Sequence, residues 1–232
     1  MKVNEIFYSL QGEGLLAGVP SVFIRLSGCP LRCWWCDTKY AWDYNSGEEL
    51  SIGKIISRVK KFNCDFVVVT GGEPLAGSDL KIRKDLPELL NALKKIKKHI
   101  TIETSGLFFE PDLDCDLMSI SPKLSNSIPA DCKTNSDYKY TSPDIKTLKK
   151  LIKQYNYQLK FVVDNPDDIF EILDIIKVIG PVKREKVLLM PQALTRKELI
   201  SKSPMVSDLC KKTGFVFGNR LQILLWDNQK GV

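Results

Sequence analysis

Short apolar runs rich in β-branched residues alternate with longer segments of helical periodicity along this chain. Six runs are predicted strands: residues 21–27, 65–70, 100–104, 116–121, 158–164 and 186–190. Five segments are predicted helices: residues 51–62, 85–98, 143–154, 166–178 and 195–213. Consecutive parallel strands need a crossover connection, which is usually a helix. The pattern therefore predicts an α/β fold, a partial (β/α) TIM-like barrel of about six parallel strands, with a further strand at residues 220–226 closing the chain.

The length of 232 residues suits one barrel of this kind. No linker rich in Pro, Gly or Ser divides the chain, so we expect a single domain over residues 1–232. The least regular part is residues 122–142, which are polar and lack apolar periodicity. We expect them to form a long surface loop that is mobile or covers the mouth of the barrel.

The N-terminus lacks a basic leader with an apolar run, and no stretch of about eighteen apolar residues could span a bilayer. We expect a cytoplasmic protein whose seven cysteines stay reduced. The net charge is +6, and lysines gather at residues 94–98 and 149–153. Both groups lie on predicted helix faces without the aromatic residues that stack on bases. We therefore expect neither a nucleic-acid partner nor a membrane partner.

Three cysteines, Cys29, Cys33 and Cys36, follow the first predicted strand. Three thiolates on a 4Fe-4S cluster leave one iron free to bind another ligand, whereas four cysteines would complete a structural zinc site. Zinc remains an alternative, although the only histidine is His99 and the other cysteines are scattered. Buried thiols without a metal are a third interpretation. The spacing alone favours the cluster.

Polar motifs also follow the later predicted strands. They occupy residues 71–74, 104–106, 121–123 and 191–192, which read Gly-Gly-Glu-Pro, Thr-Ser-Gly, Ser-Pro-Lys and Pro-Gln. In (β/α) barrels, the loops after the carboxyl ends of the strands form the active site. The sequence therefore predicts that these motifs and the three cysteines meet at one mouth.

The cysteine motif and the Gly-Gly-Glu-Pro turn together resemble the radical S-adenosylmethionine enzymes, whose cluster motif is Cys-x3-Cys-x2-Cys. The resemblance implies that the three cysteines bind a 4Fe-4S cluster, and that S-adenosyl-L-methionine chelates the free iron through its amine and carboxylate. It implies that Gly72 and Glu73 meet the amine and that Gln192 meets the adenine. The implied contacts to the ribose and carboxylate are Thr104, Ser105, Ser121 and Lys123.

Residues 5–14 and 23–29 resemble a family within that superfamily, the 7-carboxy-7-deazaguanine synthases. These segments read Glu-Ile-Phe-Tyr-Ser-Leu-Gln-Gly-Glu-Gly and Phe-Ile-Arg-Leu-Ser-Gly-Cys, and the resemblance continues to the C-terminal residues 226–232. It implies a carbon–nitrogen lyase that converts 6-carboxy-5,6,7,8-tetrahydropterin to 7-carboxy-7-deazaguanine with loss of ammonia. The product leads to queuosine in tRNA and to related 7-deazapurines. The implied reaction begins when a 5′-deoxyadenosyl radical removes hydrogen from C6 of the pterin.

The implied small-molecule substrate presents an aminopyrimidinone edge and a carboxylate. Gln11, the Gly12 backbone and Glu13 offer donors and an acceptor for the edge. Arg25 offers a planar cation for the carboxylate. In the similar synthases, a threonine at the position of Thr38 helps to bind Mg²⁺. Without these ligands the same residues would form a surface turn, an ion pair and a turn cap.

The C-terminal segment departs from the family pattern. Many similar synthases carry Gln-x-His there, whereas this chain reads Arg220-Leu221-Gln222. Gln222 could replace one hydrogen bond to the substrate but cannot act as a cation. We expect the last residues, 228–232, to fold over the mouth.

The resemblance further implies a homodimer and an electron donor such as a flavodoxin or a ferredoxin. Two alternatives remain open. One is a glycyl-radical activating enzyme, which shares the cysteine motif but acts on a protein, and against which residues 11–14 and Arg25 argue. The other is a zinc-stabilised RNA-binding module that uses the lysine-rich helix faces.

Overall fold

The computed structural model describes residues 1–129, 143–227 and 229–231. Within these residues, nine strands form one sheet in the order β3-β1-β2-β4-β5-β6-β7-β8-β9. The strands are β1 (Lys2–Leu10), β2 (Pro20–Leu26), β3 (Glu48–Glu49), β4 (Phe66–Gly71), β5 (His99–Thr104), β6 (Leu117–Ile120), β7 (Tyr157–Val163), β8 (Val187–Pro191) and β9 (Val216–Phe217). The α-helices are α1 (Ile52–Val59), α2 (Leu86–Lys95), α3 (Ile145–Gln154), α4 (Asp168–Ile179), α5 (Arg196–Thr213) and α6 (Leu221–Trp226).

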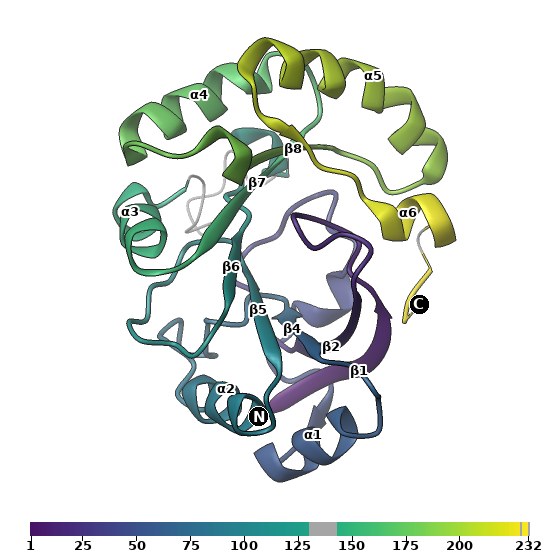
Figure 1. Cartoon of the computed structure of the whole chain (residues 1–232), viewed down its shortest axis with the longest axis vertical. Coiled ribbons are helices and arrows are strands. Elements are labelled where there is room, and N and C mark those ends of the chain that lie inside the picture. The colour runs from purple at the N-terminus through teal and green to yellow at the C-terminus, as the bar shows by residue number, and fades with distance from the viewer. Residues whose placement is uncertain (130–142, 228, 232) are drawn as a thin grey trace.

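The predicted parallel sheet is confirmed. Every neighbouring pair from β2 through β9 is parallel, and the six predicted strands are β2, β4, β5, β6, β7 and β8. Figure 1 shows this sheet as an open arc with α1 to α5 outside it, so the barrel is partial. The carboxyl ends of the parallel strands therefore face one mouth.

Burial on both faces explains why these strands are continuous apolar runs. Every residue of β7 is buried, and Val67, Val68 and Val69 of β4 are at most 2% exposed. Strands covered on both sides lack the alternation of half-exposed strands. A charged residue inside such a strand is therefore unusual, and β7 contains Lys160.

Helices α1, α3 and α5 begin at residues whose side chains cap them. Thr195 and Glu198 form a capping box at α5, and Asp144 caps α3 by accepting hydrogen bonds from the Lys146 and Thr147 amides. These contacts satisfy amide groups that have no partner inside the helix. The five predicted helices therefore agree with α1 to α5 to within a few residues.

The prediction of a strand at residues 220–226 is wrong, because this segment contains helix α6. A six-residue segment with five apolar residues is too short for periodicity to separate a strand from a helix. The place beside β8 is taken instead by β9. A second difference is β1, an antiparallel strand beside β2 that the sequence pattern did not predict.

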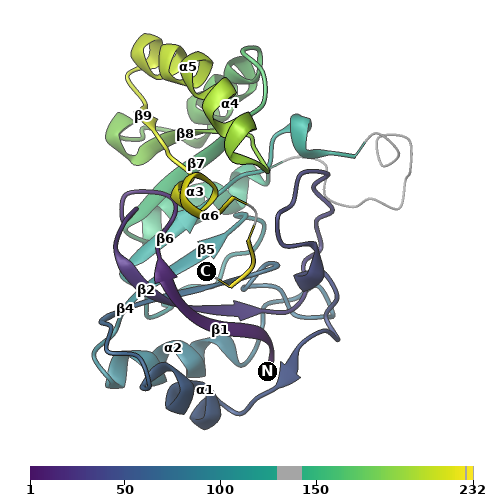
Figure 2. The same cartoon turned by 90° about the vertical axis from the view of Figure 1, so that its right-hand side faces the viewer.

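Helix α6 spans the gap in the arc. The Leu221 amide donates to the Gly12 carbonyl after β1, with N···O 2.8 Å, and the Arg220 guanidinium donates to the Ala193 carbonyl after β8. Figure 2 faces this open side and shows α6 between the two ends of the sheet. The C-terminal segment thus closes the barrel where strands do not.

The structure describes only part of the two segments that were predicted to be loops at the mouth, residues 122–142 and 228–232. The 3-10 turn Ser125–Ser127 lies within the irregular segment at residues 122–142, and residues 130–142 lie outside the described part of the chain. Of the last five residues, 228 and 232 are likewise outside it, whereas residues 229–231 line the cavity at the mouth. Among the described residues, no helix has the length and apolar character to cross a membrane.

Candidate active site

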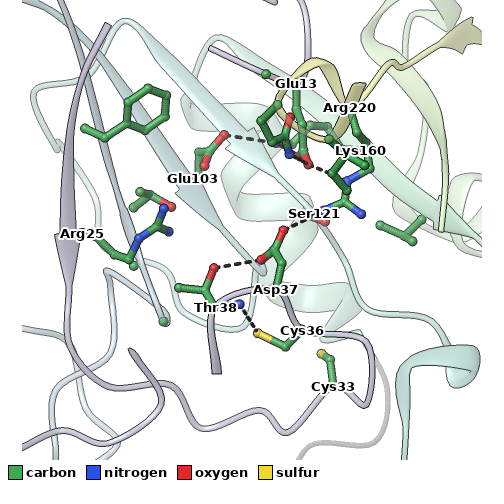
Figure 3. A pocket seen from close by; sticks show the side chains of 18 of the residues that line it. Glu13, Arg25, Cys33, Cys36, Asp37, Thr38, Glu103, Ser121, Lys160 and Arg220 are labelled. Atoms are coloured by element: carbon green, nitrogen blue, oxygen red, sulfur yellow. Dashed lines mark hydrogen bonds and ion pairs between the residues drawn. The ribbon is translucent and has the colours of Figure 1, made fainter. Parts of the chain in front are cut away.

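A cavity of about 300 Å³ opens at the carboxyl ends of the parallel strands (Figure 3). It brings together all the predicted site residues except Glu73 and Gln192. Those lining it are Gln11, Gly12, Glu13, Arg25, Cys29, Cys33, Cys36, Thr38, Gly72, Thr104, Ser105, Ser121, Lys123 and Gln222. Residues of the motifs at 71–74, 104–106 and 121–123 therefore meet the cysteines at one mouth as the sequence pattern predicted, whereas Pro191-Gln192 does not line it.

Glu73 lies behind the cavity wall and is 1% exposed. Its carboxylate accepts hydrogen bonds from the Thr104 hydroxyl, at 2.8 Å, and from the Ser105 amide, at 2.7 Å, as well as from the Ser105 hydroxyl. It therefore ties the Gly-Gly turn after β4 to the end of β5. The cavity surface at this turn belongs to Gly71 and Gly72.

The turn after β4 needs glycine. Gly71 has a φ of +145°, and a Cβ there would lie 2.1 Å from the Leu26 carbonyl oxygen. A Cβ on Gly72 would lie 2.2 Å from the carbonyl oxygen of Gly28, next to the first cysteine. Such distances exclude any side chain, so the two glycines let the turn pack directly on the cysteine loop.

Gln192 also lies outside the cavity lining. Its backbone amide donates to the Val163 carbonyl at 2.8 Å, and its side-chain oxygen accepts from Lys202 at 2.5 Å. Val162 and Met190 line the cavity at this end instead. The structure thus places an apolar wall where the sequence suggested an adenine-binding amide.

The three predicted cluster ligands line the same cavity, and Cys29 and Cys33 are buried. Burial, with a smaller effect of Glu73, raises the pKa of the Cys29 thiol to about 12. Burial likewise raises the pKa values of Cys33 and Cys36. The free chain therefore holds these groups as thiols at neutral pH, and metal binding must displace their protons.

Three thiols in one cavity are the ligand set of a 4Fe-4S cluster that keeps one iron free. Among the described residues, no three His, Cys, Asp or Glu side chains converge as ligands of a single metal ion. In a 4Fe-4S cluster each thiolate binds a different iron, so the sulfur atoms stand apart around the cluster. The donor set of three thiols in one cavity fits that group.

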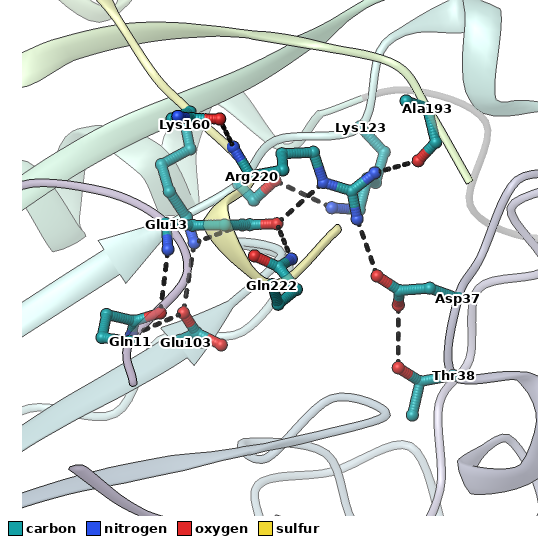
Figure 4. A network of polar contacts seen from close by, with 12 residues as sticks. Gln11, Glu13, Asp37, Thr38, Glu103, Lys123, Lys160, Ala193, Arg220 and Gln222 are labelled. Atoms are coloured by element: carbon teal, nitrogen blue, oxygen red, sulfur yellow. Dashed lines mark hydrogen bonds and ion pairs between the residues drawn. The ribbon is translucent and has the colours of Figure 1, made fainter. Parts of the chain in front are cut away.

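A charge network of Glu13, Lys160, Glu103, Arg220 and Asp37 forms another wall of the cavity (Figure 4). Lys160 Nζ lies 3.0 Å from Glu13 and 3.2 Å from Glu103, and its side chain is 3% exposed. Arg220 lies 3.0 Å from Glu13 and 2.7 Å from Asp37. The network joins β1, the cysteine loop, β5, β7 and the start of α6.

The sequence reasoning missed four members of this network: Lys160, Glu103, Arg220 and Asp37. Lys160 and Glu103 carried a local signal, because each is a charged residue inside an apolar run that is predicted to be a strand. Three of the four pairs join residues more than 140 positions apart, and Lys160 and Glu103 are 57 positions apart. No local pattern could reveal those partners.

The network holds Glu13 as a carboxylate. Burial raises its pKa, but attraction and hydrogen bonds from Lys160 and Arg220 outweigh burial and lower the pKa well below its usual range. The pKa of Lys160 is raised in turn, because Glu103 and Glu13 outweigh its burial. Both ends of this pair therefore stay charged at neutral pH.

Gln222 packs against the Gly12 turn. Its side-chain nitrogen donates to Glu13 at 3.0 Å, while its oxygen is buried without a partner among the described residues. A Cβ on Gly12 would lie 1.9 Å from that oxygen. Gly12 therefore makes room for this oxygen, which packs against the backbone of the turn.

Arg25 forms a different wall of the cavity in Figure 3. Its Nε donates to Glu5 at 2.6 Å, and its guanidinium lies 5.7 Å from the Phe7 ring centroid. No partner for its terminal nitrogens is present in the described part of the chain. Arg25 thus forms the ion pair that is expected without a ligand, and it also keeps free donors in the cavity.

Thr38 and Lys123 hold their polar atoms at the cavity wall. The Thr38 hydroxyl donates to Asp37 at 2.8 Å, and Lys123 donates to the Ser121 hydroxyl at 2.8 Å. Lys123 Nζ also lies 5.7 Å from the centroid of the Trp35 ring in the cysteine loop. Both residues are therefore oriented by neighbours before any ligand binds.

Comparison with known proteins identifies the class to which this cavity belongs. Residues 23–177, which include the three cysteines and the Gly-Gly-Glu-Pro turn, match the Radical SAM superfamily. The chain belongs to this superfamily.

Full-length relatives narrow the assignment. A 7-carboxy-7-deazaguanine synthase of Halobacterium salinarum is 38% identical over 241 residues, covering 98% of this chain and 91% of the relative. One of Pyrobaculum aerophilum is 39% identical over 236 residues, covering 100% and 97%. The crystal structure of QueE from Escherichia coli superposes with a TM-score of 0.67 at 25% identity, covering 94% and 92%. Within the superfamily, the chain is a member of the 7-carboxy-7-deazaguanine synthase family.

Membership confirms several sequence-based predictions. The protein is a radical S-adenosylmethionine enzyme of the lyase class, and its cofactors are a 4Fe-4S cluster and S-adenosyl-L-methionine. The partial-barrel fold is confirmed by its structural neighbour. The zinc-stabilised RNA-binding module and the glycyl-radical activating enzyme are thereby set aside.

We predict that Glu13→Gln lowers the free energy of unfolding by about 3 kcal/mol at pH 7, because it leaves two buried cations undercompensated. Since folding lowers the pKa of Glu13, its stabilising effect is complete above its ordinary value of 4.5 and is lost as the pH falls through the lowered folded value. The difference in unfolding free energy between the wild type and the variant should therefore become smaller as the pH falls.

Urea unfolding from pH 7 down to pH 3 measures this difference. Asp208→Asn is the matched control, because it removes an exposed carboxylate paired with Lys211 and should cause no measurable change. An equal loss of stability in both variants, or a gap for Glu13→Gln that is independent of pH, would contradict the role of the charge network.

Proposed function

We propose that this chain converts 6-carboxy-5,6,7,8-tetrahydropterin to 7-carboxy-7-deazaguanine, with loss of ammonia, in the cavity at the mouth of the barrel. The observation that carries the proposal is the arrangement of three walls around one cavity. One wall holds the cysteines, another holds the fixed carboxylate of Glu13, and a third holds Arg25. A ligand with hydrogen-bond donors at one end and a carboxylate at the other matches the last two walls.

The pyrimidine end of the pterin would bind at Glu13. Its carboxylate is charged and can accept N–H groups from an aminopyrimidinone edge. The Gln11 side chain is fixed by a contact to Glu103 at 3.3 Å and by the Glu13 amide at 3.1 Å, and it lies beside this edge. Gln222 lines the cavity at the same edge, and its side-chain nitrogen donates to Glu13.

The carboxylate of the pterin would bind at Arg25. Because Glu5 occupies only Nε, the terminal nitrogens can make two parallel hydrogen bonds to a carboxylate. Tyr40 donates to the same Glu5 oxygen at 2.5 Å and so helps to fix the pair. Arg25 is therefore oriented by Glu5 and available to the substrate.

Thr38 is our candidate ligand for Mg²⁺. Its hydroxyl proton points to Asp37, so its lone pairs are available to a cation. A neutral hydroxyl is a weak ligand, and Mg²⁺ would complete its shell with substrate oxygens and water. The ion would then bridge the protein and the substrate.

The cofactor end of the cavity is formed by the cysteines and the strand-end polar groups. Together the cluster and S-adenosyl-L-methionine supply the one-electron chemistry of the reaction. The Gly72 backbone, Thr104, Ser105, Ser121 and Lys123 line the cavity and are candidates for direct contact with the cofactor. The burial of Glu73 and Gln192 supports an indirect role for them, in which Glu73 holds Thr104 and Ser105 in place.

Assembly and supply of electrons follow from the family resemblance. We propose a cytoplasmic homodimer that accepts electrons from a flavodoxin or a ferredoxin. We further propose that residues 1–232 act as one radical S-adenosylmethionine domain, which the continuous sheet supports. The pterin is the small-molecule partner.

The direct test is anaerobic incubation of reconstituted protein with a reductant, S-adenosyl-L-methionine, Mg²⁺ and 6-carboxytetrahydropterin. Mass spectrometry should detect 7-carboxy-7-deazaguanine. Formation of 5′-deoxyadenosine without this product would show that the enzyme class is right and the substrate is wrong.

We predict that Arg25→Ala raises KM for the pterin by roughly 10- to 100-fold, the effect of losing a hydrogen-bonded charge. Cleavage of S-adenosyl-L-methionine in the absence of pterin should be unchanged, since Arg25 is assigned to the substrate alone. Parallel assays of product and of 5′-deoxyadenosine separate the two effects. Equal loss of both activities would show that Arg25 supports the cofactor or the fold instead.

A further inference from the structure

Arg220 contacts three loops from different parts of the cavity (Figure 4). Its Nε lies 3.0 Å from Glu13, its Nη2 lies 2.7 Å from Asp37, and its Nη1 donates to the Ala193 carbonyl. The side chain is 8% exposed. Burial alone would lower its pKa, but Glu13 and Asp37 raise it, so the guanidinium is a permanent cation.

The contact with Asp37 links Arg220 to Thr38, the candidate ligand for Mg²⁺. Arg220 binds one carboxylate oxygen of Asp37, and the Thr38 hydroxyl donates to the other at 2.8 Å. Because a hydroxyl has only one proton, this bond directs the lone pairs of Thr38 away from Asp37. Arg220 therefore fixes the carboxylate that orients Thr38.

The contact with Glu13 links Arg220 to the proposed binding site for the pterin. Arg220 and Gln222 share the same oxygen of Glu13, while Lys160 binds the other. A planar guanidinium holds its donors in fixed relative directions. A shift of Asp37 is thus transmitted to Glu13, and a shift of Glu13 to Asp37.

We propose that Arg220 is a positioning residue that couples the Mg²⁺ site at Thr38 to the pterin site at Glu13. Beyond the direct contact of the ion with the substrate, each ligand then binds more tightly when the other is present, because each fixes the guanidinium in the geometry that the other needs. Coupling between sites is reciprocal, so the same factor applies in both directions. The inference rests on the proposed function and goes beyond it, since it gives Arg220 a role that links the two sites rather than a role within one of them.

This coupling depends on the fixed directions of the guanidinium donors rather than on the positive charge. A lysine at residue 220 would keep the charge, but a single ammonium cannot hold Glu13, Asp37 and the Ala193 carbonyl in the same fixed directions. Arg220→Lys therefore separates charge from geometry.

The test measures the Kd of 6-carboxytetrahydropterin with and without Mg²⁺. The protein is loaded anaerobically with cluster and S-adenosyl-L-methionine, and reductant is omitted so that no turnover occurs. In the wild type, Mg²⁺ should tighten pterin binding about tenfold or more, within the usual range of coupling between sites. In Arg220→Lys the factor should fall by about fivefold or more, leaving the part that comes from direct contact between ion and substrate, and circular dichroism and iron content should match the wild type.

Arg196→Lys is the matched control. Arg196 anchors the other end of α6 through the Leu224 carbonyl at 2.6 Å and the Leu225 carbonyl at 2.8 Å, without touching Glu13 or Asp37. It should keep the full Mg²⁺ effect. Equal loss in both arginine variants would show that the docking of α6 is responsible and would overturn the proposal.

A double-mutant cycle tests whether Arg220 acts through Thr38. Thr38→Val should abolish the Mg²⁺ effect, and adding Arg220→Lys should not change it further. The proposal is overturned if Arg220→Lys retains the tenfold effect or if the wild type shows none. Failure of the wild type to bind the pterin at all would instead refute the proposed function.

Discussion

The contact of Glu13 with Lys160 and Arg220 is the interaction on which the rest of the site depends. The sheet is an open arc, so its two ends must be joined by something other than strand pairing. Glu13 follows β1 at one end, Lys160 lies within β7, and Arg220 begins α6. Buried ion pairs add little net stability, because removing charges from water offsets their attraction, but an unpaired partner is costly. The network therefore selects one arrangement of the mouth.

The cofactor side depends on a second constraint, the close packing of the glycine turn on the cysteine loop. Gly71 and Gly72 approach the backbone of residues 26 and 28 too closely for any side chain. Glu73 then binds Thr104 and Ser105, so the ends of β2, β4 and β5 are linked. This linkage places the cysteines beside the strand-end hydroxyls before any cofactor binds, and the charge network places the substrate groups opposite them.

The sequence predicted the parts of this structure that depend on local periodicity. Strands buried on both faces and helices with caps have signals within a few residues, and Cys29, Cys33 and Cys36 form a compact motif. Helix α6 was mistaken for a strand because a six-residue, mostly apolar segment fits either period. The pairs of Lys160 and Arg220 with Glu13 depend on tertiary structure and left no local trace. Motif position alone could not indicate that Glu73 and Gln192 turn away from the cavity, because that depends on the packing of their neighbours.

The affinity of Lys160→Met for 6-carboxytetrahydropterin tests the central claim most directly. This variant keeps a long, unbranched side chain but removes the cation that lies between Glu13 and Glu103. Equilibrium dialysis of anaerobically reconstituted protein should show a pterin Kd raised about tenfold or more, with wild-type iron content. An unchanged Kd would contradict the account, because Glu13 would then bind the substrate without the network that holds it.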